Sequence, residues 1–222
     1  MKEIGFAIIK YAFLPSITVA VYTLFVYKRL PDELKRLSWY ILLSAFIEIF
    51  SRMYWLYSQN NMPLLHLYVP GSFFCLALFY QKVLDTFVDK KIIIGMLGAF
   101  LLFSFINSFF IQNIYTYDSN GLLVESILVV ILSISTFMVM MDDVVKKKRS
   151  GLSRSLNWIN SGLFIYYTSS LIIFHFARLL FDDLSYKRFS ENFNLQTWIL
   201  HAFFLLIMYS CFFVGLWHRP KT

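Results

Sequence analysis

Seven apolar stretches alternate with short polar segments along the 222 residues of this chain. An α-helix rises 1.5 Å per residue, so about 20 apolar residues are needed to cross the hydrocarbon core of a bilayer. The stretches cover residues 5–27, 38–58, 63–85, 91–112, 121–141, 157–181 and 194–217. They predict an all-α membrane protein, a seven-transmembrane-helix bundle that forms a single domain over residues 1–222.

The overall composition agrees with lipid as the main solvent. Hydrophobic residues make up 59% of the chain and the mean hydropathy is +0.63, whereas soluble domains are roughly 45–50% apolar. A soluble domain must cover itself with polar residues, and this chain has too few of them. Cys75 and Cys211 both lie inside apolar stretches. They are expected to pack as small hydrophobic residues and imply no disulfide framework.

The distribution of Lys and Arg predicts the orientation. The first, third and fifth loops and the C-terminus hold thirteen of these residues, and the N-terminus and the even-numbered loops hold four. Cytoplasmic loops carry the excess of positive charge. We therefore expect the N-terminus outside the cell and the C-terminus in the cytoplasm, with the chain crossing the plasma membrane several times. The net charge of +7 needs no nucleic-acid partner.

A basic segment from Lys146 to Arg154 follows the fifth stretch. Such a segment beside a helix end contacts anionic lipid headgroups. The alternative interpretation is a docking site for a cytosolic signalling protein. The sequence leaves open whether the chain forms a homo-oligomer.

Ionisable residues within the predicted helices are the candidate functional residues, because lipid disfavours each of them singly. With the predicted orientation, seven of them lie between the bilayer midplane and the outer surface, and the inner half holds almost none short of the interface. We expect them to face one another, or a water-filled cavity that binds a small ligand from the outer side. The candidate binding residues, with one neighbouring tryptophan, are Glu48, Arg52, His66, Glu125, His175, Arg178, Trp198 and His201.

Glu48 is the deepest of these side chains, and Arg52 follows it at a spacing that permits an ion pair on one helix face. The same residues also fit a structural network that fixes helix register. His66, Glu125 and Arg178 lie near enough to the surface to reach the headgroups. Polar residues such as Asn160, Tyr166 and Ser133 are more typical of interhelical hydrogen bonds than of a binding site.

No motif for a known chemistry is present, so no catalytic residue, cofactor or metal site is predicted. The sequence contains no Gly-x-Ser-x-Gly elbow, no phosphate-binding glycine loop and no His-Glu-x-x-His segment. The histidines of the predicted helices lie on separate helices, without the close spacing of most zinc sites. The last stretch, 194–217, has no lysine, which excludes a retinal protein.

Four short segments carry a resemblance: residues 60–68 before and in the third stretch, 123–126, 157–162 and 198–202. Together they resemble a family of small seven-helix bacterial membrane proteins of unknown function. The resemblance implies a protein of the bacterial inner membrane that often accompanies signalling proteins. It draws attention to His66, Glu125, Trp158, Asn160, Trp198 and His201. Pro70, Gly71 and Ser72 stand where similar sequences tend to have an acidic residue.

Three functions fit these observations. The favoured one is a receptor-like or sensory membrane subunit, in which a ligand or proton binds in the outer half of the bundle and a separate cytosolic protein reads the change. The alternative is a transporter or an oligomeric ion-conducting pore. The second alternative is a membrane-embedded, metal-dependent lipid hydrolase, although an enzyme is less favoured than a sensory subunit.

Overall fold

A computed structural model describes residues 11–142, 150–181 and 187–220. Side chains are described over 11–142, 151–173 and 196–220. Within these ranges the chain is helical and contains no strand. The α-helices are α2 (Leu14–Val26), α3 (Asp32–Ser58), α4 (Met62–Val83), α5 (Lys90–Ile106), α6 (Ser119–Met141), α8 (Ser150–Phe181) and α9 (Lys187–Trp217). A 3-10 turn, Tyr27–Arg29, follows α2, and a π-helical turn, Asn107–Ile111, follows α5.

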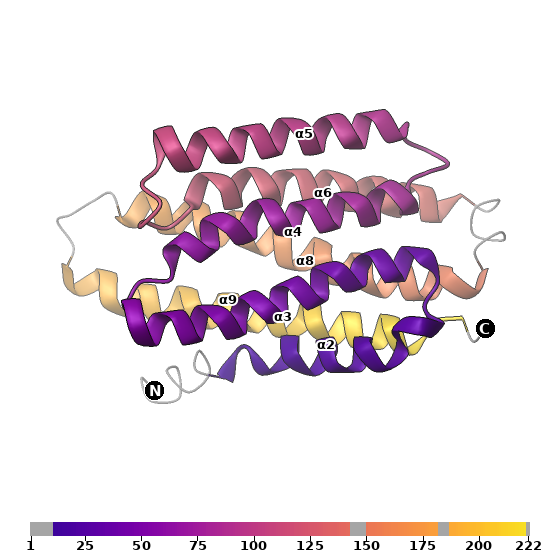
Figure 1. Cartoon of the computed structure of the whole chain (residues 1–222), viewed down its shortest axis with the longest axis horizontal. Helices are drawn as coiled ribbons and strands as arrows, with labels where there is room; N and C mark the ends of the chain where they lie inside the picture. Colours follow the sequence, from indigo (N-terminus) through magenta and orange to yellow (C-terminus); the bar gives the residue numbers. More distant parts are fainter. Residues whose placement is uncertain (1–10, 143–149, 182–186, 221–222) are drawn as a thin grey trace.

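The helices lie side by side and successive helices run in opposite directions (Figure 1). Helix α8 packs against α6 and α9, whereas α4 contacts α3, α5 and α6, and α2 contacts α3 and α9. Helix α5 lies at the edge of the bundle. Figure 1 also shows that α6 and α9 run in the same direction, so α8 returns the chain from one end of the bundle to the other.

Four helices among the described residues are long and apolar enough to cross a membrane: Met62–Val83, Lys90–Ile111, Ser119–Met141 and Gln196–Trp217. The surface of the bundle also carries large apolar side chains, with Phe25 83% and Met141 80% exposed. Extended apolar surface is rare on soluble monomers and marks contact with lipid or with a partner. The architecture is therefore that of a helical membrane protein.

The helices extend beyond the apolar stretches that predicted them. Helix α3 begins at Asp32 instead of residue 38, α8 at Ser150 instead of 157, and α9 at Lys187 instead of 194. Hydropathy detects only the apolar part of a helix, whereas the backbone continues through polar turns until a cap or a proline stops it. The predicted stretch 91–112 ends in the π-helical turn. The first part of the stretch 5–27 lies outside the described residues.

Small residues bring α8 and α9 together. A Cβ atom added at Gly215 would lie 2.6 Å from Ile159 Cγ1, and one added at Gly162 would lie 2.8 Å from Cys211 Cβ. The Ser155 hydroxyl donates to the Gly215 carbonyl at 2.7 Å. Close approach at small residues, reinforced by a hydroxyl hydrogen bond, is typical of helix pairs in membranes.

Candidate functional site

One polar cluster surrounds the His66 imidazole near the start of α4. His66 Nδ1 lies 2.9 Å from Ser108 Oγ, and His66 Nε2 lies 3.0 Å from the Thr116 carbonyl oxygen. Because a carbonyl oxygen can only accept, Nε2 must carry a hydrogen. In the neutral ring, Nδ1 then accepts from the Ser108 hydroxyl. We define the His66 cluster as the side chains joined to it at this end of the bundle: His66, Asn107, Ser108, Gln112, Asp118, Ser119 and Asn120.

Asp118 is the charged partner in this cluster, and its side chain is fully buried. One oxygen, Oδ1, accepts from the Gly121 amide at 3.0 Å and from Asn107 Nδ2 at 2.8 Å, so Asp118 caps the start of α6. The other oxygen, Oδ2, lies 3.7 Å from His66 Nδ1. Burial raises the pKa of the Asp118 carboxyl above its ordinary value, while the facing His66 and the two donors pull it down.

Amide side chains complete the cluster around the π-helical turn. Asn107 Nδ2 donates to Asp118 Oδ1 and also, at 2.9 Å, to Gln112 Oε1. Asn107 Oδ1 accepts a hydrogen bond from Asn120 Nδ2 at 3.0 Å. Gln112 also donates to Ser119 at 2.9 Å. These bonds fasten the connection after α5 to the first turn of α6. A π-helical turn is rare and occurs frequently at functional sites.

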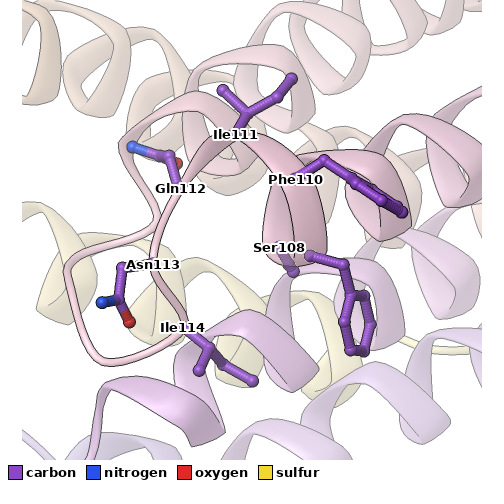
Figure 2. A pocket seen from close by; sticks show the side chains of 7 residues that line it. Ser108, Phe110, Ile111, Gln112, Asn113 and Ile114 are labelled. Carbon is purple, nitrogen blue, oxygen red and sulfur yellow. The ribbon is translucent and has the colours of Figure 1, made fainter.

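A hollow of about 410 Å³ opens beside this turn and is lined by residues 108–114. Figure 2 shows the lining side chains around it, with Gln112, Asn113 and Ile114 on the connecting loop and Ser108 and Phe110 on the helical turn. Ser108 and Gln112 belong both to the wall of the hollow and to the His66 cluster. A molecule in the hollow would therefore touch Ser108, which is bonded to His66, and Gln112, which is bonded to Asn107 and Ser119.

Glu125 lies two helical turns beyond Asp118 on α6 and is almost fully buried. Its Oε1 accepts from the Ser72 hydroxyl of α4 and, at 3.2 Å, from the Tyr167 hydroxyl of α8. Asp118 is near enough to act on it electrostatically. The carboxylate thus joins three helices and continues the polar path from the His66 cluster into the bundle.

Glu48 and Arg52 of α3 interact electrostatically but form no salt bridge with each other. Glu48 Oε2 accepts from the Ser16 hydroxyl of α2 at 3.2 Å. The Arg52 guanidinium instead lies over the Phe13 ring, 3.9 Å from its centroid, and its side chain is exposed. The ion pair that the spacing permits is therefore absent, because Arg52 reaches outward to an aromatic face.

Five tyrosines from four helices lie near Glu48 and Glu125, three of them buried and two partly exposed. We define this tyrosine cluster as Tyr40, Tyr68, Tyr166, Tyr167 and Tyr209, from helices α3, α4, α8 and α9. Tyr68 Oη lies 3.0 Å from Ser44 Oγ. Tyr166 lies within electrostatic range of both Glu48 and Glu125. Of these five tyrosines only Tyr166 was named from the sequence, as a residue typical of interhelical hydrogen bonds. Tyrosines well inside apolar stretches are a signal for the others, since tyrosine is enriched at the membrane surface.

His201 and Trp198 of α9 join the same region through ring contacts. The His201 ring centroid lies 5.5 Å from that of Tyr166 and 5.8 Å from that of Trp198. Trp198 in turn packs edge-on against Tyr117 at 6.2 Å. Among the predicted site residues, His66, Glu125, Trp198 and His201 therefore lie on one connected path. His175 and Arg178 fall in the part of α8 whose side chains are not described.

Asn160 and Ser133 form interhelical bonds, as their residue types suggested. The Tyr80 hydroxyl lies 2.7 Å from Ser133 Oγ and donates to Asn160 Oδ1 at 3.1 Å, and Asn160 Nδ2 donates to the Ser133 carbonyl at 3.0 Å. The Asn160 side chain, which makes two of these bonds, is fully buried. This arrangement fixes α4, α6 and α8 against one another.

The fold and these contacts define a helical protein with apolar, membrane-compatible helices and buried polar clusters. Comparison with models of protein families, with curated proteins and with solved structures finds no similar protein. Among the described side chains, no group of three or more His, Cys, Asp or Glu could hold a metal ion.

Proposed function

We propose that this chain is a sensory subunit of the cell membrane that binds a proton or a small polar ligand at the His66 cluster. Binding changes the arrangement of α4, α6 and α8, and a separate cytosolic protein reads that change at the basic segment around residues 146–154. A protein of this kind needs no catalytic centre of its own.

The proposal includes seven membrane crossings with the N-terminus outside. The direction of the helices supports this. Helices α6 and α9 are both apolar enough to cross a membrane and run in the same direction. If both cross it, the chain between them must cross back, and α8 is the helix that connects them. At 1.5 Å per residue, α8 and α3 are each about 40 Å long or longer, enough for the crossing.

The observation that carries the proposal is the connection between His66 and the helices beyond it. The His66–Asp118 pair caps α6, Glu125 on the same helix bonds to α4 and α8, and Tyr167 leads into the tyrosine cluster. Histidine changes its charge near neutral pH. A proton on His66 would act directly on Asp118, the charged group facing it, and through Asp118 on Glu125.

The test compares two histidines in lipid nanodiscs. Hydrogen–deuterium exchange of the cytoplasmic loops is measured as the pH falls from about 8 to 5. We expect the wild-type loops to change their exchange and the His66→Asn variant to lose that response. His218→Asn is the matched control, because His218 is exposed near the other end of the bundle.

Two results would contradict the sensory function. One is an unchanged loop response in the His66→Asn variant. The other is a pH-driven proton flux into liposomes containing only this protein, which would favour the transport alternative. Glu48, Glu125 and the hydroxyls between them would then be the candidate relay.

A further inference from the structure

A second hollow, of about 640 Å³, lies along α8, away from the His66 cluster. Its walls are Ser153, Arg154, Asn157, Trp158, Ser161, Ile165 and Cys211. The first six residues lie on one face of α8, and Cys211 of α9 closes one side. We call this hollow the α8 groove. None of its lining residues belongs to the His66 cluster or the tyrosine cluster.

The groove exists because short side chains alternate with long ones. Gly162 has no side chain, so α9 approaches closely there and Cys211 reaches the groove. Ser161 adds little volume beside it. Trp158, 43% exposed, rises above these small residues as a wall. An elongated depression results where a helix face would otherwise be filled by large side chains.

Polarity changes from one end of the groove to the other. Arg154 and Asn157, both exposed, lie at the end where α8 begins, beside Ser153, whose hydroxyl donates to Met140 Sδ at 3.8 Å. Ile165 and Cys211 form the apolar end. Eleven residues separate Arg154 from Ile165, or about 16 Å along the helix. That is roughly half of a 30 Å hydrocarbon core, the depth of a single leaflet.

We infer that the α8 groove binds one anionic phospholipid, with its phosphate at Arg154 and Asn157 and an acyl chain along Trp158, Ser161 and Ile165. Arg donates planar, charge-assisted hydrogen bonds to phosphate oxygens, and the Asn157 amide supplies a neutral donor. Trp158 lies one turn from Arg154, at the depth where tryptophan favours the membrane interface. The charge at one end and the apolar wall at the other match a lipid and not a free anion.

The experiment is native mass spectrometry of the full chain in mild detergent. The protein is titrated with dioleoylphosphatidylglycerol, with dioleoylphosphatidylcholine and with inorganic phosphate. We expect one phosphatidylglycerol to bind the wild-type protein more tightly than phosphatidylcholine, and inorganic phosphate to compete weakly. Arg154→Gln should weaken phosphatidylglycerol binding about tenfold and phosphatidylcholine binding less, because the choline cation already offsets the charge of that lipid's phosphate.

Two further variants separate the groove from general surface charge. Arg29→Gln removes an exposed arginine that does not line the groove, and should not change binding. Ser161→Phe fills the middle of the groove and should weaken both lipids, with thermal melting confirming that the variant is folded. Three results would each overturn the inference. Phosphatidylglycerol binding could fall equally in Arg154→Gln and Arg29→Gln, or lipid binding could stay unchanged in folded Ser161→Phe. The third result is full competition of inorganic phosphate with phosphatidylglycerol.

Discussion

The hydrogen-bond partners of His66 fit both the neutral and the protonated ring. Nε2 already donates to the Thr116 carbonyl, and the Ser108 hydroxyl can either donate to Nδ1 or accept from it. A protonated ring would keep both contacts and gain attraction to Asp118, 3.7 Å away. The cluster therefore accommodates both charge states, which a group that senses protons requires.

Replacing Asp118 with Asn tests the electrostatics of this pair. Burial raises the pKa of the Asp118 carboxyl, so the folded state binds its proton more tightly than the unfolded state does. The unfolded chain has the ordinary Asp pKa of 3.8, and the folded chain has a higher one. As the pH falls from the folded-state pKa toward 3.8, the contribution of Asp118 to stability therefore rises, and it is lost again as the pH increases. We expect Asp118→Asn to remove this part of the pH dependence of the melting temperature.

The measurement is thermal unfolding of both proteins in detergent across the acid range. Asn also caps helices well, so the variant should fold. Identical pH dependence in the two proteins would show that the Asp118 carboxyl does not titrate differently in the folded state.

Gly121 tests the cap itself. A Cβ atom there would overlap the Asp118 carboxylate, so Gly121→Ala must displace the capping group from its donors. We expect the free energy of unfolding to fall by about 1–3 kcal/mol. The control is Gly98→Ala on α5, where nothing lies within 4 Å and the loss of backbone freedom should instead stabilise by about 0.5–1 kcal/mol. Equal effects at the two glycines would contradict the role of the cap.

The site residues divide into those that sequence could indicate and those that it could not. His66 and Glu125 stand out because an ionisable side chain within an apolar stretch demands a partner. Asp118 lies in a polar loop, where a carboxylate is ordinary, and only the folding of that loop over His66 makes it notable. For Arg52 the sequence permits an ion pair with Glu48 that the structure does not form. The spacing of the two residues does not determine which way a long side chain turns, and Arg52 lies over the Phe13 ring.

Among the helices, the pair α8 and α9 depends on the absence of side chains at two glycines. At Gly215 a Cβ would lie 2.6 Å from Ile159 Cγ1 and 2.9 Å from the Ser155 carbonyl oxygen. Backbone atoms cannot move aside cheaply. Gly215→Ala should therefore separate the helices and cost about 1–3 kcal/mol, measured as a lower melting temperature.

Gly95→Ala on the open face of α5 is the matched control for this prediction, because nothing lies within 4 Å of its added Cβ. A melting temperature for Gly215→Ala equal to that of the control would show that α8 and α9 do not pack at this point. Apolar stretches alone predict where helices occur, but they do not identify such contact points. The contact points depend on which face of one helix packs against which face of the next.

For the molecule as a whole, the number of membrane crossings is the property that hydropathy leaves open. Helix α3 carries Glu48 and Arg52, and α8 begins with polar turns, which lowers their mean hydropathy although both lie in the same bundle as the four apolar helices. For α8 the packing explains this difference, because a helix held between α6 and α9 needs less apolar surface than one surrounded by lipid.

Single cysteines at the ends of the helices test the seven-crossing arrangement. Ser58→Cys and Tyr115→Cys lie at one end of the bundle, and Lys28→Cys and His218→Cys lie at the other. With the N-terminus outside, a maleimide that cannot cross membranes should label the first pair on intact cells and the second pair only after lysis. The wild-type protein supplies the background, because Cys75 and Cys211 are buried. Labelling of Ser58→Cys and Lys28→Cys from the same side would mean that α3 does not cross the membrane. The orientation proposed from the basic loops would then also be wrong.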